Sequence, residues 1–325
     1  MLIISIPRWF IDDKRLRNST ELRRLIGTIL GRYGAVFAPL TCDCRELTRN
    51  RYGCDYERLN QQANQLVNAL DIVKHELGLQ VGEIEIHTEY QVPMWWSGDF
   101  VDNYIKAITR VIEEVEKRSE AIREVSIEVH PGFGGAEKSR ETKPIIDGVT
   151  RLMMGIATVV SNYGLRLSLN VEARSSSSTI DRRPQAIATL EELTNFITRL
   201  RQELGNHGLD VEVVPVIDVP QLIRAYMKVR RMPKEEAQRH VIEKARALVT
   251  RQRSELHVHW FREPEMRMPH APITIDVWNT VYKPIIQEAA NKSYVTIVPE
   301  ISPMTSIHDI VNTLRIITNQ VNEDA

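Results

Sequence analysis

Two patterns of apolar residues alternate along the chain. Short runs rich in β-branched residues, typical of buried strands, occur at 2–6, 34–40, 83–87, 125–130, 165–171, 211–217, 255–259 and 294–298. Helix-like segments, in which apolar residues recur every three or four positions, occur at 19–33, 57–78, 100–120, 143–163, 188–205, 233–249, 274–290 and 305–320. Strands separated by helices pair in parallel through right-handed crossovers. The pattern therefore predicts an α/β chain that forms a single (β/α)8 TIM barrel domain over residues 1–325.

An open doubly wound sheet is the alternative for such an alternation. That fold commonly carries a glycine-rich phosphate-binding turn after its first strand, and the segment "IPRWF" at 6–10 contains no glycine. The closed barrel is therefore favoured.

Composition places the chain among ordinary globular proteins, with 42% hydrophobic and 26% charged residues. The net charge of −1 gives no overall attraction to nucleic acid or to anionic lipid. No apolar run has the length of a membrane span, and "MLIISIPRWF" lacks the flanks of a signal peptide. We therefore expect a cytoplasmic protein without a membrane partner.

Three cysteines, Cys42, Cys44 and Cys54, lie close together in the sequence. Their number is odd, and the C-x-C spacing lacks the second pair that a four-ligand structural zinc site needs. Free thiols in a reducing compartment are the expected state, with a zinc site as the alternative.

Six consecutive predicted strands, the third to the eighth, each end in a histidine or a carboxylate. These residues are His87, His130, Glu172, Asp218, His257 (followed by His259) and Glu300. Because the carboxyl ends of barrel strands meet at one mouth, we expect these side chains to converge there. Mixed imidazole and carboxylate ligands suit zinc, manganese or iron better than calcium or magnesium, and zinc is the first choice, followed by manganese. The alternative is an ion-paired cluster without a metal.

These motifs resemble the xylose isomerase-like barrel superfamily and, within it, most of all endonuclease IV, a metal-dependent apurinic-site endonuclease. The similarity extends from the second strand to the eighth and rests on the order and spacing of short motifs. They are "FAPLTCDCREL" (37–47), "HTEY" (87–90), "HPG" (130–132), "NVEA" (170–173), "IDVPQ" (217–221), "LHVH" (256–259) and "PE" (299–300).

The resemblance implies two metal sites that share one bridging carboxylate. His87, His130 and Glu172 would bind one ion, and the second ion would be held by Glu172, Asp218, His257 and Glu300. The third site of that family needs a histidine where this chain has Gln221. It also needs an Asp-x-His pair, of which only His270 is present because Met268 replaces the aspartate. We therefore expect a third site that is weakened or absent.

The resulting prediction is a divalent-metal-dependent phosphodiester hydrolase that acts on damaged or abasic DNA. Glu172 and Glu300 would be catalytic, the first by bridging two ions and the second by orienting a water molecule. The side chains expected to contact the substrate are Arg45, Tyr90, Arg174, Arg182, Gln221, His259 and Trp260.

A sugar isomerase or epimerase of the same superfamily is the alternative. That branch places a Glu, Asp, His, Glu quartet around one metal, which Glu172, Asp218, His257 and Glu300 also satisfy. Its two glutamates exchange protons with the carbons that flank a carbonyl, and the substrate would be a small sugar or sugar phosphate. Because a one-metal isomerase does not need His87 and His130, these histidines favour the hydrolase. A non-catalytic metal-binding barrel remains a further alternative.

Overall fold

Eight parallel strands close into a barrel in a computed structural model that describes residues 2–48, 51–117, 121–136, 140–174, 185–262, 267–289 and 293–323. The strands follow one another around the barrel in the order β1-β12-β9-β8-β7-β6-β5-β2. Their bounds are β1 (Leu2–Pro7), β2 (Ala35–Pro39), β5 (Glu83–His87), β6 (Glu124–Val129), β7 (Arg166–Glu172), β8 (Glu212–Asp218), β9 (Ser254–His257) and β12 (Val295–Val298). The prediction of a closed (β/α)8 barrel is confirmed.

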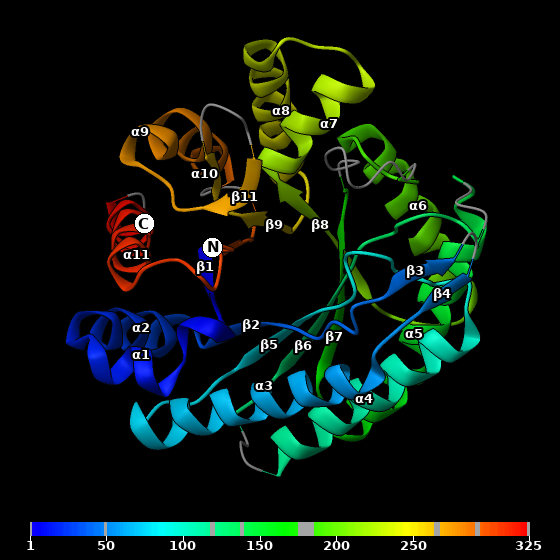
Figure 1. Ribbon diagram of the computed structural model, residues 1–325, viewed down its shortest axis with the longest axis horizontal. Helices are drawn as coiled ribbons and strands as arrows, with labels where there is room; N and C mark the ends of the chain where they lie inside the picture. Colours follow the sequence, from blue (N-terminus) through cyan, green and yellow to red (C-terminus); the bar gives the residue numbers. More distant parts are fainter. Residues whose placement is uncertain are drawn as a thin grey trace.

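Helices surround the barrel (Figure 1). The helices of the repeating units are α2 (Thr20–Tyr33), α3 (Tyr56–Glu76), α4 (Gly98–Glu116), α5 (Lys143–Asn162), α6 (Leu190–Asn206), α8 (Lys234–Val249), α10 (Lys283–Ala289) and α11 (Ile307–Glu323). A short 3-10 turn, η1 (Arg8–Phe10), follows β1, and α9 (Ile275–Val277) and the π-helical turn η2 (Trp278–Tyr282) precede α10. The last helix packs on the first, where Arg315 of α11 pairs with Glu21 of α2.

Helix α5 is the one described helix that is long and apolar enough to cross a membrane by length and composition. It packs against α4, α6 and β7, and 50% of its most apolar window is buried. A helix in the outer layer of a barrel buries one face against the strands and neighbouring helices. The apolar residues of α5 are therefore accounted for by packing in the core.

Two helices were not predicted from the sequence pattern: α1 (Asp13–Asn18) and α7 (Val219–Val229). Pro220 falls in the first turn of α7, where its missing N–H costs no hydrogen bond. The carboxylate of Asp218, the last residue of β8, accepts a hydrogen bond from the N–H of Gln221 at 2.9 Å and so caps α7. The same aspartate therefore ends a strand and begins a helix.

Two antiparallel hairpins extend from loops at the carboxyl ends of the barrel strands. The first pairs β3 (Arg45–Thr48) with β4 (Arg51–Gly53), and the second pairs β10 (Trp260–Arg262) with β11 (Arg267–Ala271). Their strands have only three to five residues, which is too short for a periodic pattern to reveal.

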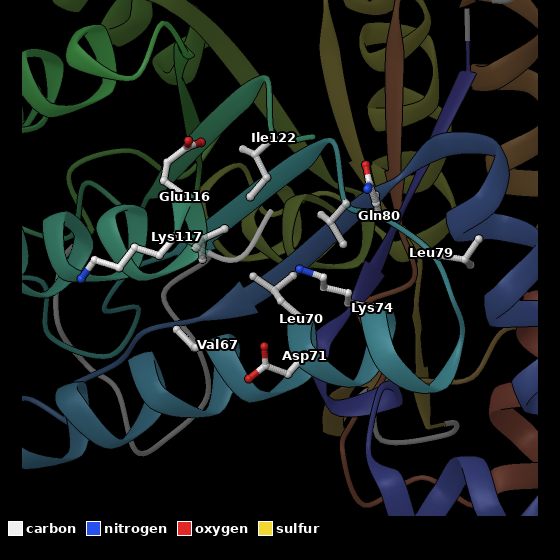
Figure 2. A pocket seen from close by; sticks show the side chains of 11 residues that line it. Val67, Leu70, Asp71, Lys74, Leu79, Gln80, Glu116, Lys117 and Ile122 are labelled. Carbon is white, nitrogen blue, oxygen red and sulfur yellow. The ribbon is translucent and has the colours of Figure 1, made fainter. Parts of the chain in front are cut away.

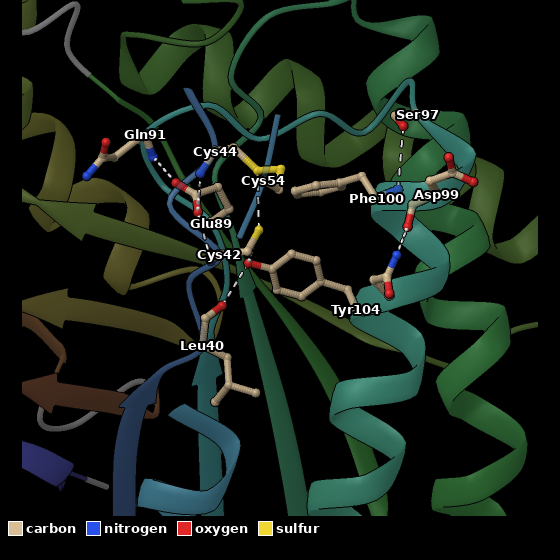
Figure 3. Close-up of a disulfide and its surroundings, with 11 residues drawn as sticks. Leu40, Cys42, Cys44, Cys54, Glu89, Gln91, Ser97, Asp99, Phe100 and Tyr104 are labelled. Carbon is tan, nitrogen blue, oxygen red and sulfur yellow. Dashed lines mark hydrogen bonds between the residues drawn. A yellow bond between two sulfur atoms is a disulfide. The ribbon is translucent and has the colours of Figure 1, made fainter. Parts of the chain in front are cut away.

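The expectation of three free thiols is wrong for two of them. A disulfide joins Cys44 to Cys54 across the open end of the β3–β4 hairpin, while Cys42 remains a buried thiol with its sulfur 3.2 Å from that of Cys44 (Figure 3). Hairpin pairing places Arg45 opposite Gly53, so the cysteines that flank these two residues face each other. This pairing cannot be predicted from the spacing of the cysteines in the sequence, because it depends on the pairing of β3 with β4.

The inside of the barrel is polar, whereas barrels of this kind are commonly filled by valine, isoleucine and leucine. Strand register places His87 beside Glu128, and Glu128 beside Asn170. The residues that alternate with these polar residues along each strand, such as Ile86 on β5 and Ile127 on β6, are fully buried apolar side chains that face the helices. The alternation of strand residues thus brings polar groups into the barrel and puts the apolar contacts outside it.

Candidate active site

The six strand-end residues predicted as a ring lie together at the carboxyl end of the barrel. His87, Glu172, Asp218 and His257 are the last residues of β5, β7, β8 and β9, while His130 follows β6 directly and Glu300 follows β12 by two residues. Five of the six are at most 4% exposed, and the side chain of Glu300 is 14% exposed. The structure therefore brings the predicted residues into one buried cluster.

Glu172, Asp218, His257 and Glu300 come from four strands that are neighbours in the barrel, and we call them the outer quartet. The Nδ1 atom of His257 lies 3.0 Å from Oε2 of Glu300 and 3.8 Å from Oε2 of Glu172. One ligand atom each from Glu172, Asp218 and His257 lie within 4.8 Å of one another. Oε1 of Glu172 is buried without a hydrogen-bond partner. A buried acceptor without a donor, such as Oε1 of Glu172, is what a bound cation satisfies, so these residues fit a divalent metal ion.

His257 links the outer quartet to the barrel interior. Its Nε2 atom donates to Oε1 of Glu255 at 2.7 Å, which leaves Nδ1 directed toward Glu172 and Glu300. A carboxylate that orients a histidine in this way is a common neighbour of metal-binding histidines. In the metal-free chain burial would lower the pKa of His257, but Glu128 and Glu300 raise it well above its usual value. The imidazolium then supplies positive charge to the surrounding carboxylates.

Asp218 is held by groups on two sides. One carboxylate oxygen caps α7, and the other accepts from Nε2 of His259 at 3.0 Å. The N–H of His270 donates to Nδ1 of His259 at 2.9 Å, and this bond fixes which ring nitrogen carries the proton. Gln221, three residues after Asp218, provides the N–H for the cap. The cap explains the aspartate at the start of α7, whereas it places no demand on the side chain at position 221.

The two glutamates of the outer quartet have opposite pKa shifts in the metal-free chain. Burial raises the pKa of Glu172 to about 8. Burial would also raise the pKa of Glu300, but the nearby His270 and His257 outweigh it and hold the pKa well below its usual value. Burial lowers the pKa of His270, but Glu300 outweighs it and raises the pKa to about 9. Two carboxyl groups in one site are thus driven toward different protonation states, as in many acid–base sites.

His87 and His130 form the other side of the cluster. Their Nε2 atoms lie 3.0 Å apart, and that of His130 lies 3.2 Å from Oε2 of Glu172. Burial lowers the pKa of His87 to about 4 and that of His130 well below its usual value, so both rings are neutral near pH 7. Tyr90, with its ring 5.8 Å from that of His87, is 37% exposed, and the guanidinium of Arg174 lies 5.4 Å above the tyrosine ring.

The other predicted substrate residues are placed differently. Arg45 is exposed on β3, Trp260 is 9% exposed on β10 beside Phe261, and His259 is fully buried against Asp218. Gln221 is 9% exposed in the first turn of α7. Arg182 and the side chain of Met268 lie outside the described residues.

Among the polar residues one pleat deeper, the sequence pattern indicated Glu128 as an interior neighbour of His130, whereas Glu85 and Glu255 were missed. Glu85, Glu128 and Glu255 each stand two residues before a strand-end histidine, in "EIH", "EVH" and "ELH". This repeated spacing is the signal that could have identified them, because residues two apart on a strand face the same side.

A cavity of about 340 Å³ lies at the opposite end of the barrel (Figure 2). Its walls come from the second half of α3 and from the segments that precede β5 and β6, including Lys74, Gln80, Lys117 and Ile122. Because the histidines and carboxylates lie at the carboxyl ends of these strands, this cavity is separate from the candidate active site.

No family model matches the chain, and no curated protein matches it at a significant level. Solved structures do resemble it over nearly the whole length. A mannonate dehydratase from Streptococcus suis has a TM-score of 0.53 and 11% identity, with 100% of this chain and 93% of that chain covered. A xylose isomerase domain protein from Alicyclobacillus acidocaldarius has a TM-score of 0.51 and 11% identity, with 100% and 99% covered. An IolI protein with a bound zinc atom has a TM-score of 0.51 and 10% identity, with 100% and 99% covered.

The prediction of an endonuclease IV-type hydrolase acting on damaged or abasic DNA is wrong. The similar structures are a mannonate dehydratase, a xylose isomerase domain protein and a zinc-bound IolI protein, and they do not support action on DNA. The error arose because the outer quartet fits both alternatives, so that the choice between them rested mainly on His87 and His130. The chain has a TIM barrel fold similar to the folds of these structures.

Proposed function

We propose that this chain is a divalent-metal-dependent isomerase or epimerase of a small sugar or sugar phosphate. The observation that carries the proposal is the outer quartet, in which Glu172 and Glu300 approach the same nitrogen of His257 from strands on either side of it. Two carboxyl groups beside one metal position are the machinery that proton exchange next to a sugar carbonyl requires.

The outer quartet would hold one divalent ion, zinc or manganese, which when bound would polarise the carbonyl and hydroxyl oxygens of the sugar. One of the two glutamates, as carboxylate, would accept the proton from the carbon beside the carbonyl, while the bonding electrons move to the carbonyl oxygen. The other, as carboxylic acid, would return a proton to carbon and restore the carbonyl. His259 would keep Asp218 oriented through its hydrogen bond.

His87 and His130 would serve the substrate in this proposal. As neutral rings they can each donate one hydrogen bond and accept another, which suits sugar hydroxyl groups. Tyr90 and Arg174 lie next to these histidines, and a guanidinium is suited to a phosphate or carboxylate on the substrate. The zinc of the IolI structure and the mannonate dehydratase neighbour support a metal-dependent sugar enzyme. A cytoplasmic location stays a prediction.

Proton exchange with solvent tests the proposal directly. The chain, loaded with manganese or zinc, is incubated in heavy water with a panel of ketoses, aldoses and their phosphates, and deuterium at carbon is followed by mass spectrometry. We expect incorporation beside the carbonyl of at least one sugar. Glu172→Gln and Glu300→Gln should each lower the rate by about 10²–10⁴, the range for loss of a general acid or base.

Glu203→Gln is the matched control, because Glu203 lies on α6 and contacts only the partly exposed His207 among the ion pairs of the described chain. It should leave the rate unchanged. A folded, metal-loaded chain that exchanges no sugar would refute the proposal and favour a non-catalytic barrel. Exchange that survives in both glutamine variants would place the chemistry elsewhere.

A further inference from the structure

A second polar group lies one pleat deeper in the barrel, beneath the outer quartet. It consists of Glu85, Glu128, Asn170 and Glu255, from β5, β6, β7 and β9, and we call it the inner group. All four are at most 3% exposed. The side-chain amide of Asn170 donates to Glu85 at 2.6 Å and to Glu255 at 2.7 Å, which connects the carboxylates across the barrel.

Several oxygen atoms of the inner group have no hydrogen-bond partner. Neither carboxylate oxygen of Glu128 has one, although the residue is fully buried. The Nε2 atoms of His87 and His257 are the nearest ion-pair contacts, at 3.6 and 3.7 Å, beyond hydrogen-bond distance. Oε2 of Glu85 and Oδ1 of Asn170 also lack one. One ligand atom each from Glu128, Glu255 and His257 lie within 4.8 Å of one another. Buried oxygens left unsatisfied in this way are costly unless a cation or a proton meets them.

The number of buried carboxylates also indicates that a second cation or protons are needed in the barrel. The inner group and the outer quartet together bury the carboxylates of Glu85, Glu128, Glu172, Asp218, Glu255 and Glu300. One divalent ion in the outer quartet would neutralise two of these six charges. Four buried carboxylates then remain for a second cation or for protons to neutralise.

We propose that the inner group binds a second cation, coordinated by Glu128 and Glu255, whose ligand atoms lie within 4.8 Å of each other, with Glu85 and Asn170 hydrogen-bonded beside them. Its donors are oxygen atoms, so the ion belongs to the hard class of which Mg²⁺ and Mn²⁺ are the common members. His257 separates the two positions, with Nδ1 directed to the outer quartet and Nε2 bonded to Glu255. An inner ion would fix Glu255 and, through it, the orientation of His257.

Protons are the competing occupants. Burial, followed by the neighbouring carboxylates, raises the pKa of Glu85 and of Glu128 well above the usual value in the cation-free chain. Two protonated glutamates would remove the excess charge without a metal. The test must therefore separate an ion from protons at this position.

The number of bound manganese ions and their positions distinguish a second cation from protons. The chain is stripped with a chelator, dialysed against Mn²⁺, and measured by elemental mass spectrometry and by anomalous diffraction at the manganese edge. We expect two ions per chain, one peak within the outer quartet and one beside Glu128. Glu85→Gln and Glu128→Gln keep the side-chain size and should each lose one ion and the inner peak.

Glu83→Gln is the matched control, because Glu83 stands on the same face of the same strand but pairs with Arg253 at 3.2 Å. It should keep both ions. Should the inner variants fail to fold, as judged by thermal unfolding, the wild-type anomalous map still decides. A wild-type map without the inner peak overturns the proposal, as does a second ion located between His87 and His130 or an unchanged ion count in folded Glu85→Gln. None of these readings depends on sugar turnover, so the inner cation and the proposed function succeed or fail separately.

Discussion

His259 illustrates how one residue can position another without touching a substrate. Both of its ring nitrogens are used by the protein, Nδ1 by the N–H of His270 and Nε2 by Asp218, and its ring stacks on that of His270 at 4.4 Å. Because both ring nitrogens already make hydrogen bonds, His259 is suited to orienting Asp218 and not to binding the proposed metal ion itself.

His259→Ala should therefore weaken metal binding by about 10- to 100-fold without changing the number of ions bound, as loss of such a partner commonly does. Competition with a chromophoric chelator measures the affinity. His259→Gln, whose amide can still donate to Asp218, should recover most of it, and His207→Ala on the partly exposed end of α6 should have no effect. Complete loss of an ion in His259→Ala would instead make His259 a ligand.

At the scale of elements, the sequence predicted the barrel strands because their apolar runs are compact and evenly distributed. It missed α7 because Pro220, which suits the first turn of a helix, looks like an interruption when read along the chain. It missed both hairpins and the Cys44–Cys54 bond because these depend on strand pairing, and pairing is not visible in a short pattern. The strand-end residues could be found, whereas their depth and partners could not.

The disulfide gives a prediction for the β3–β4 hairpin. The two cysteines are 10 residues apart in the sequence. A disulfide that closes a loop of this length lowers the conformational entropy of the unfolded chain, which stabilises the folded state by about 2–3 kcal/mol. The double variant Cys44→Ser with Cys54→Ser should therefore lower the free energy of unfolding by up to about that amount. Urea unfolding measures the loss.

Reducing agent provides the control, because it should destabilise the wild-type chain and leave the double variant unchanged. Tyr52 of β4 packs against Trp96 and Phe133 at 5.9 and 5.8 Å and donates to the carbonyl of Ala136, so the hairpin has contacts of its own. Equal stability of the oxidised wild type and the double variant would show that these contacts suffice without the disulfide.

At the scale of the whole molecule, the alternation of strands and helices was enough to predict the TIM barrel fold, but the order of strand-end residues was not enough to predict the function. Glu172, Asp218, His257 and Glu300 fit both the nuclease and the isomerase alternatives. The choice therefore depended mainly on His87 and His130, whose presence does not decide between them. What distinguishes the branches is the shape and charge of the loops over the mouth, and these form only when distant parts of the chain assemble.

We expect the carboxyl-terminal end of the barrel to carry the function and the amino-terminal end to contribute mainly to stability. At the amino-terminal end Arg253, with a side chain 12% exposed, contacts Glu83 at 3.2 Å, Glu124 at 2.6 Å and Glu212 at 3.1 Å. Glu83 and Glu124 are buried, so removing the guanidinium leaves carboxylates without their main partner. Breaking a buried ion pair from one side commonly costs about 3–5 kcal/mol.

Arg253→Met should therefore lower the free energy of unfolding by about 3 kcal/mol, the lower end of that range, because Arg166 still contacts Glu124 at 2.9 Å. Arg151→Met is the control, since Arg151 and Asp102 form an exposed pair that should contribute less than about 1 kcal/mol. Urea unfolding compares the two variants. Metal content and proton exchange per folded molecule should match the wild type in both, because these residues lie away from the mouth. A loss of exchange in folded Arg253→Met would mean that the ion pairs at the amino-terminal end also hold the outer quartet in place.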